Sequence, residues 1–310
     1  MKTLSNLILL TFVLALLGCN YQKQNNQKEK EQTISKSGEL VFGDKKLTYF
    51  IEGEGIPCFV CADGELQKGC ISDNLKKYFQ FVFIEQRHST YYGEPKDYSK
   101  ITMDTIVDDI ELLRTKLGFG KVYVLGHSII GLIALEYTRK YPENTKGVIM
   151  INTPSQFDKD YMNIVNKYWD ENASEGRKKI LLNNLKNLEM LNKDSISKVK
   201  WDYLSYKANA PKYYYDSMYS ETPFFRVNEE GWNHFYSITW NYDIERTRIE
   251  TPIFLSLSKF DFMVPEIMWS DYINKLPTLT IYNFEKSGHY PHVEEQELFD
   301  KLLLNWIKGN

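Results

Sequence analysis

Three residues of the chain have the types and the chain order required for nucleophilic catalysis by a serine. Ser128 stands in Gly126-His127-Ser128, between a run of apolar residues and a pattern typical of a helix. A serine on such a strand–turn–helix junction is raised clear of the sheet, and the N–H groups that follow point at a developing oxyanion. The hydroxyl needs a base, and the base needs an orienting acid. The sequence therefore predicts a catalytic triad of Ser128 as nucleophile, Asp261 as orienting acid and His289 as general acid and base.

Asp261 and His289 each follow a predicted strand, at 252–257 and 279–284. The carboxyl ends of parallel strands meet at one edge of a sheet, where open α/β folds bind ligands. An aspartate in this position could instead cap a helix, and a loop histidine could simply be solvated. His292 is a rival base, but it lacks the preceding glycine and lies nearer the last predicted helix. This context favours His289.

Backbone N–H groups near the nucleophile are the predicted oxyanion donors. Ile129 supplies one, and Ala62 or Asp63, at the end of a short apolar run, supplies the other. Ile130 is β-branched at a turn where strand and helix pack closely. It either crowds this turn or is accommodated by Gly131, which follows it.

The sequence predicts no metal and no cofactor. Three further histidines lack the spacing of metal ligands: His88, His127 and His234. Cys58 and Cys61 have no second cysteine pair to complete a zinc site, and their spacing on a predicted strand points them to opposite faces. Cys70 could form a disulfide with Cys61, or all three thiols could be buried and reduced.

Hydrophobic patterning predicts alternating strands and helices. The predicted strands are 46–51, 57–62, 81–84, 122–125, 147–151, 252–257 and 279–284, and the predicted helices are 72–79, 106–117, 129–141, 265–275 and 298–308. Such alternation builds an α/β fold, with a mostly parallel central sheet and helices on both faces. The aromatic, helical stretch at 155–246 is too long for a loop. It predicts a helical cap inserted into a core made of 38–154 and 247–310.

The N-terminal residues predict export. Residues 1–18 combine Lys2 with the apolar run Leu7–Leu17, which is typical of a signal peptide. The run ends in Leu16-Leu17-Gly18-Cys19, which resembles a bacterial lipobox, so we expect Cys19 to carry a lipid anchor. The alternative is an ordinary secretory signal with a chance cysteine. Residues 19–37 are too polar to pack and predict a flexible tether on a bacterial membrane, on its periplasmic or its cell-surface side.

In its order of elements, the chain resembles α/β hydrolases of the prolyl iminopeptidase-like branch. The resemblance covers about residues 39–310 and is closest in these segments: Glu85-Gln86-Arg87, 104–128, 134–142 and the motifs around Asp261 and His289. It implies the α/β-hydrolase fold and cofactor-free hydrolysis of an ester or amide in a small molecule or short peptide. In that branch, acidic cap residues hold the free amine of the substrate. Glu229 and Glu230 are candidates by composition.

Three departures from the family pattern leave two interpretations. The departures are Ile130, the loop 61–65 in place of a glycine-rich oxyanion loop, and the turn 88–92. The first interpretation is a serine hydrolase with an intact triad. The second is a catalytically weak protein that binds a small apolar ligand under its cap.

The net charge of −3 shows no excess of positive charge that would favour binding to nucleic acid. Three tryptophans could line an apolar pocket or form the core of the cap: Trp201, Trp232 and Trp240.

Overall fold

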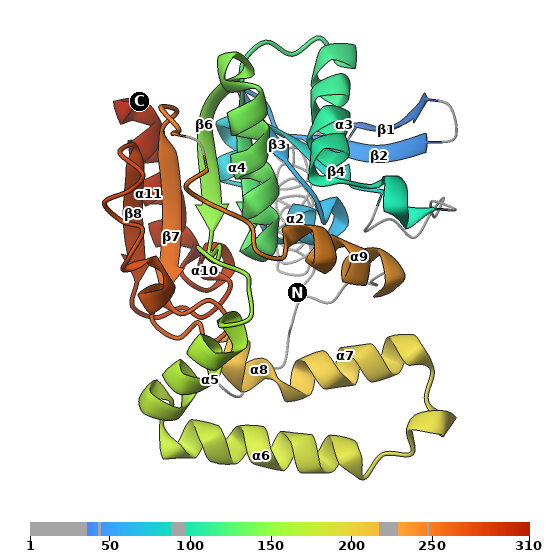
Figure 1. Ribbon diagram of the computed structural model, residues 1–310, viewed down its shortest axis with the longest axis vertical. Helices are drawn as coiled ribbons and strands as arrows, with labels where there is room; N and C mark the ends of the chain where they lie inside the picture. The colour runs from blue at the N-terminus through green and yellow to red at the C-terminus, as the bar shows by residue number, and fades with distance from the viewer. Residues whose placement is uncertain (1–35, 43–44, 88–96, 217–228, 247) are drawn as a thin grey trace, which may run out of the picture. The chain divides into compact units, whose positions relative to one another are not determined.

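The computed structural model describes residues 36–42, 45–87, 97–216, 229–246 and 248–310 (Figure 1). They belong to one compact unit, Ser35–Asn310. The predicted signal peptide, the predicted lipidation site Cys19 and the turn at 88–92 lie outside the described residues. The first strand begins at Lys36, at the end of the segment predicted as a tether.

Eight strands of the described chain form one sheet, in the order β1-β2-β4-β3-β5-β6-β7-β8. Their bounds are β1 Lys36–Phe42, β2 Lys45–Glu52, β3 Ile56–Val60, β4 Phe79–Glu85, β5 Val122–His127, β6 Thr145–Ile151, β7 Ile253–Ser258 and β8 Leu279–Phe284. The pairs β1–β2 and β2–β4 are antiparallel, and every further neighbouring pair is parallel. The predicted fold class, a mostly parallel α/β sheet, is confirmed.

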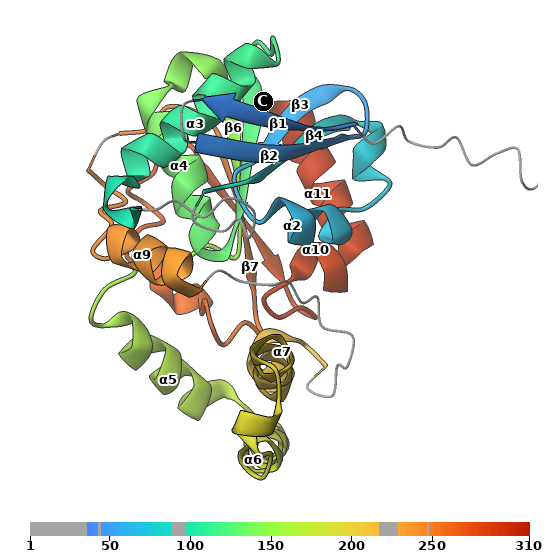
Figure 2. The ribbon, with the colours of Figure 1, turned by 90° about the vertical axis from the view of Figure 1, so that its right-hand side faces the viewer.

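Helices cover both faces of the sheet, so the central strands are apolar on both sides. The helices α3 (Met103–Lys116) and α4 (Gly131–Lys140) lie on one face, and α2 (Gly64–Cys70), α10 (Pro291–Glu294) and α11 (Gln296–Gly309) lie on the other (Figure 2). Adjacent strand residues therefore enter separate cores: Phe59 packs with α3 and α4, and Val60 packs with α11. Burying each such side chain contributes roughly 1.5–3 kcal/mol relative to leaving it exposed.

Helix α3 shows how the sequence sets an element boundary. Thr102 and Thr105 form a capping box, in which each side-chain oxygen accepts the backbone N–H of the other residue, at 3.2 and 2.9 Å. This satisfies N–H groups that the first helical turn leaves unpaired. The helix ends before Gly118, whose φ of +74° is readily adopted by glycine.

The predicted helix at 72–79 is wrong, because those residues contain only a 3-10 turn at Leu75–Lys77. The helix in this region is α2, which precedes them and was not predicted. Its two glycines give it poor intrinsic helix propensity. It forms because Leu66 and Cys70 are buried beside the sheet, and because Gly64 brings its backbone close to β4.

The predicted helix at 265–275 is also wrong. Only Glu266–Trp269 is helical, as a 3-10 helix, and turns follow it. Met268 and Trp269 are buried, and the Ser270 hydroxyl donates to the Ile267 carbonyl at 2.8 Å. A local side-chain bond of this kind competes with regular helix hydrogen bonding.

The stretch predicted as a cap, 155–246, carries helices that lie beyond the carboxyl ends of β6 and β7 (Figure 1). In its described part the α-helices are α5 Tyr161–Asn172, α6 Glu175–Glu189, α7 Lys198–Ala208, α8 Ala210–Tyr213 and α9 Glu229–Thr239.

Arg177 of α6 binds backbone carbonyls at and after α8 and packs against the loop that follows β7. Its guanidinium donates to the carbonyls of Pro211 and Tyr214 at 2.8 and 2.7 Å. The same group lies over the rings of Phe260 and Phe262, 5.3 and 5.5 Å from their centroids. These rings flank Asp261, so the cap is packed against the loop that carries the predicted acid.

Cys58, Cys61 and Cys70 are free and buried, so the alternative of a Cys61–Cys70 disulfide is wrong. Burial raises the pKa of Cys70 to about 12 and also raises the pKa of Cys58 and Cys61 above the usual range of a thiol. Within the described ranges, no group of three or more His, Cys, Asp or Glu side chains is arranged to hold a metal ion. The described helices also include none with the length and apolarity needed to cross a bilayer.

Candidate active site

Ser128 lies in a tight turn between β5 and α4. Its backbone φ of +56° falls in the left-handed region, which is uncommon for a residue with a side chain. The turn closes because Gly126 has no side chain: a Cβ there would lie 2.5 Å from the carbonyl oxygen of Ile130 and 2.6 Å from the nitrogen of Gly131. The strain and the close packing match what a nucleophile elbow requires.

Ile130 contacts Gly126 through its backbone, and its own side chain packs elsewhere. That side chain is 3% exposed and belongs to the core cluster on the α3–α4 face. A second close approach is at Gly131, where a Cβ would lie 2.6 Å from Cγ2 of Thr153. The turn therefore requires glycine at 126 and 131, and it places the large side chain of residue 130 in the core.

Asp261 and His289 are in direct contact. His289 Nδ1 lies 2.7 Å from Asp261 Oδ2, and Asp261 is completely buried. The other carboxylate oxygen, Oδ1, accepts the backbone N–H groups of Met263 and Val264, both at 2.8 Å. With Nδ1 directed at the carboxylate, Nε2 of His289 is free to exchange a proton with a substrate or nucleophile.

Asn152 also binds this carboxylate and was not predicted as a site residue from the sequence. The residue follows β6 directly and is fully buried. Its Nδ2 donates to Asp261 Oδ2 at 2.8 Å and to the Gly288 carbonyl at 3.1 Å. The signal in the sequence was a polar residue at the carboxyl end of a predicted strand, the same signal that identified Asp261.

His292 is less suited than His289 to act as the base. It is 1% exposed, and burial lowers its pKa to about 3. Neither ring nitrogen of His292 has a hydrogen-bond partner among the described residues. Burial likewise holds the pKa of His127 well below its usual range, and Nε2 of His127 donates to the carbonyl of His289 at 2.8 Å. The neutral His127 thus supports the backbone of His289.

The loop after β3, which was predicted to supply an oxyanion donor, carries Ala62 and Asp63. Ala62 is buried, and Asp63 adopts a left-handed backbone with φ of +55°. Asp63 is 8% exposed, and its Oδ1 has no hydrogen-bond partner in the described part of the chain. Burial, and then the nearby Glu85, raise the pKa of Asp63 well above its usual range.

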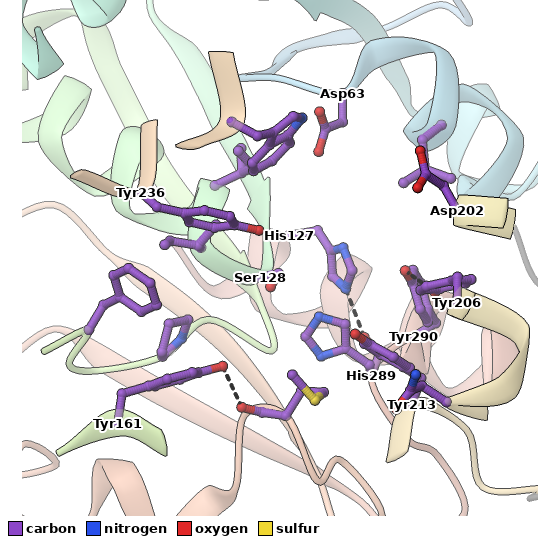
Figure 3. A pocket seen from close by; sticks show the side chains of 18 of the residues that line it. Asp63, His127, Ser128, Tyr161, Asp202, Tyr206, Tyr213, Tyr236, His289 and Tyr290 are labelled. Atoms are coloured by element: carbon purple, nitrogen blue, oxygen red, sulfur yellow. Dashed lines mark hydrogen bonds between the residues drawn. The ribbon is translucent and has the colours of Figure 1, made fainter. Parts of the chain in front are cut away.

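A cavity of about 590 Å³ lies at this site. Ser128, Ile129 and His289 all line it, and Figure 3 shows Ser128 between aromatic side chains from both sides. Aromatic side chains form a large part of its lining: Phe157, Tyr161, Tyr206, Tyr213, Trp232, Tyr236 and Tyr290. Two carboxylates, Asp63 and Asp202, also line it, whereas none of the described lining residues is a lysine or arginine.

Several predicted cap residues lie outside this cavity. Glu229 and Glu230 are exposed at the start of α9, and Glu229 pairs with Lys198 at 3.1 Å. Of the three tryptophans considered for the pocket, only Trp232 lines the cavity. Trp240 is 47% exposed and packs on Phe157. Composition could not show which of these residues line the cavity, because it gives no information on which helix face points inward.

Known proteins share this architecture. The family model described as alpha/beta hydrolase fold matches residues 61–296. The AB hydrolase superfamily protein YclE of Bacillus subtilis is 29% identical over 276 residues, covering 84% of this chain and 95% of YclE. A proline iminopeptidase of Flavobacterium johnsoniae is 34% identical over 113 residues, 36% of either chain.

Among solved structures, an alpha/beta fold family hydrolase from Bacillus anthracis superposes with a TM-score of 0.65 at 22% identity. The superposition covers 88% of this chain and 99% of that one. Sequence and structure agree on the same architecture, and the matched segment contains the elbow, the buried Asp261 and His289. The chain belongs to the α/β-hydrolase fold family.

Proposed function

We propose that this protein is a serine hydrolase that cleaves a small ester or amide through an acyl-enzyme. Ser128 is the nucleophile, His289 the general acid and base, and Asp261 the acid that orients His289. The observation that supports this most directly is the 2.7 Å contact between His289 Nδ1 and Asp261 Oδ2, beside a cavity that Ser128 also lines.

The reaction proceeds in two halves. As Oγ of Ser128 attacks the substrate carbonyl, its proton passes to Nε2 of His289, and the oxyanion binds the N–H of Ile129 and that of Ala62 or Asp63. His289 then protonates the leaving oxygen or nitrogen, and the acyl group stays on Ser128. In the second half, His289 takes a proton from water as the water oxygen attacks the ester carbon. His289 then returns this proton to Oγ of Ser128 as the bond between Oγ and the acyl carbon breaks, and the acid is released.

The cavity favours a neutral or cationic substrate with apolar parts. Aromatic rings bind apolar groups and attract cations through their faces. Asp63 and Asp202 line the cavity and Asp202 is paired with Lys198 at 2.8 Å, but no described lining residue is a lysine or arginine that could bind an anion. An aminoacyl ester or amide has both properties, in keeping with the relatives named proline iminopeptidase.

A fluorophosphonate probe followed by peptide mapping tests this proposal. We expect the probe to label the tryptic peptide that contains Ser128, and Ser128→Ala to remove the label. Kinetics on matched aminoacyl amides and short acyl esters would then define the substrate. Failure of a folded wild-type protein to react with the probe, together with no turnover, would refute the proposal.

The second candidate function is binding without efficient turnover. The observation in its favour is the loop at Asp63, where a carboxyl group lines the cavity close to a predicted oxyanion donor. A negative charge there would oppose the developing oxyanion. Calorimetry with small apolar ligands, on a protein that the probe leaves unlabelled, would support this candidate.

We also propose that the protein is exported and lipid-anchored through Cys19. The support is the Leu16-Leu17-Gly18-Cys19 sequence after an apolar run, followed by a polar stretch. Metabolic labelling with a palmitate analogue should mark the wild type and leave Cys19→Ala unlabelled. Cys70→Ala is the matched control, because its buried thiol should not affect labelling. Equal labelling of the wild type and Cys19→Ala would exclude this anchor.

A further inference from the structure

The side chain of Asn152 makes contacts that go beyond packing. The residue is fully buried at the end of β6, and its φ of +43° lies in the left-handed region. Asparagine tolerates this conformation better than most residues with a side chain. The amide thus stands at the same sheet edge as Ser128 and Asp261, on the strand between the strands that precede them.

Neighbouring groups fix which way the Asn152 amide points. The hydroxyls of Ser256 and Ser258 donate to Oδ1 at 3.1 and 3.4 Å. Nδ2 therefore faces Asp261 Oδ2 at 2.8 Å and the Gly288 carbonyl at 3.1 Å. The reversed amide would place its oxygen against a carboxylate and a carbonyl, leaving acceptors facing acceptors.

Oδ2 of Asp261 is consequently shared by two donors, Asn152 Nδ2 and His289 Nδ1, at 2.8 and 2.7 Å. Together with the two backbone N–H groups on Oδ1, these contacts set both the position and the plane of the carboxylate. Supporting contacts of this kind keep a catalytic constellation within the narrow geometry that turnover needs.

We propose that Asn152 is a positioning residue for the Asp261–His289 pair. Its amide holds Oδ2 in line with His289 Nδ1, and its bond to the Gly288 carbonyl steadies the backbone that precedes His289. The inference rests on the proposed function, in which His289 takes the Ser128 proton. Asn152 is not among the described residues that line the cavity, so its loss should affect kcat more than KM.

The Asp261–His289 pair has other titratable neighbours, and their protonation also contributes to the pH profile. Those that face it from the surrounding elements are His127 of β5, Tyr161 and Tyr168 of α5, Tyr213 of α8, and His292 and Glu294 of α10. None of them is altered by a substitution at Asn152, so a change in the profile of a variant reports on residue 152.

The test compares Asn152→Ala and Asn152→Asp with the wild type. Thr138→Ala is the control, because this buried side chain donates to the Ala134 carbonyl within α4 and lines no part of the cavity as described. We expect Asn152→Ala to lower kcat about 10- to 100-fold with KM little changed, as is typical for loss of a hydrogen bond to a charged group. Thr138→Ala should lower the melting temperature and leave kcat unchanged.

Asn152→Asp supplies a readout that a purely structural role would not change, and it retains the side-chain shape if the alanine variant fails to fold. A second buried carboxyl group at hydrogen-bond distance from Asp261 cannot be ionised beside it, so the two groups share one proton, and this proton competes with His289 Nδ1 for Oδ2 of Asp261. The imidazolium form of His289 is then less well stabilised, so the acidic limb of kcat/KM should move to lower pH. In proton NMR, the His289 Nδ1 signal, identified by its absence in His289→Gln, should shift in both variants.

Two results would overturn this inference. One is an Asn152→Ala protein whose kcat lies within twofold of a wild type that turns over substrate. The other is an unshifted Nδ1 signal with an unchanged acidic limb in Asn152→Asp. A wild type that the fluorophosphonate probe does not label refutes the proposed function instead, and the Nδ1 signal still shows whether Asn152 positions the pair.

Discussion

The backbone of Tyr213, in the cap, lies directly against Gly288, the residue before His289. The His289 N–H donates to the Tyr213 carbonyl at 2.5 Å. A Cβ at position 288 would lie 2.7 Å from the carbonyl carbon of Tyr213 and 2.7 Å from Cα of Tyr214. Only glycine fits this approach without moving either segment. The cap and the loop of the proposed base are thus in contact through their main chains.

Gly288→Ala should therefore impair turnover while the sheet stays folded. The added methyl group must displace the cap segment or the loop that carries His289. A shift of about 1 Å in a reacting group can lower the rate roughly 10²-fold. We expect a loss of this size in kcat/KM on an activated ester.

Gly176→Ala in α6 is the control for that measurement. A Cβ there would meet only Ser174 Oγ at 4.0 Å, and replacing a helical glycine stabilises a helix by up to about 1 kcal/mol. This variant should keep full activity and melt at the same or a higher temperature. Equal activity of Gly288→Ala and Gly176→Ala would show that the close approach is not needed.

Removing His289 should reduce the proposed hydrolase activity more completely than removing His292. His289 lines the cavity and contacts Asp261, whereas His292 is buried and does not line it. Loss of a triad member typically lowers kcat ~10⁴-fold or more. Steady-state kinetics of His289→Ala and His292→Ala, with melting curves for both, would check this. If His292→Ala were the inactive protein while still folded, the assignment of the base would be wrong.

The sequence predicted the sheet better than the helices beside it. β5 and β7 are buried along their length and rich in apolar residues, and each is followed by a turn with a polar residue, so this pattern drew attention to Ser128 and Asp261. Helix α2 and the region at 265–275 were mistaken because packing of Leu66 and Met268 against the core overrides local propensity. Asn152 carries the signal that identified Asp261, a polar residue at the end of a predicted strand. Its role could not be predicted, because its contact with Asp261 joins residues far apart in sequence.

Ile130→Gly should lower stability without raising activity. The side chain is buried in the main core, so its loss leaves a cavity, and large-to-small changes of this kind typically reduce stability by about 2–5 kcal/mol. The close contact in the elbow is between backbone atoms of Ile130 and Gly126, so it would be unaffected. Chemical denaturation and esterase kinetics would measure both effects. A large gain in kcat would instead show that Ile130 impairs the site and would favour the weakly catalytic interpretation.

Glu294 should make the fold less stable as pH rises through neutrality. Its carboxylate accepts the N–H of Gly288 and of Tyr215, at 2.8 and 2.7 Å, and burial raises its pKa from 4.5 to about 7. Between those two values the folded state holds a proton that the unfolded state has released. The stabilisation is therefore complete below pH 4.5 and is lost as pH rises through 7.

Melting temperatures between pH 4.5 and 8 would test this sign. The wild type should lose more stability over that range than Glu294→Gln, which has no proton to release. Glu297→Gln, at the exposed start of α11, should follow the wild type. Parallel curves for the wild type and Glu294→Gln would contradict the expectation.

Asp63 should select substrates by charge. It is buried beside Glu85 and lines the cavity together with Asp202, so a bound ammonium group would stabilise its ionised form. Asp63→Asn should lower kcat/KM for an aminoacyl ester more than for the same ester without the amine. Glu230→Gln, exposed on α9, is the control. An equal loss of kcat/KM on both esters would show that Asp63 does not bind the amine.

Three residues with left-handed backbones, Asp63, Ser128 and Asn152, stand at the ends of the neighbouring strands β3, β5 and β6. In a residue other than glycine, such a conformation disfavours folding by roughly 1–2 kcal/mol, and by less in Asn and Asp. The sheet must therefore be stable enough to offset this unfavourable free energy at the ends of three neighbouring strands. A search for heat-resistant variants should accordingly select glycine at these positions, and it would tend to produce proteins that are more durable and less active.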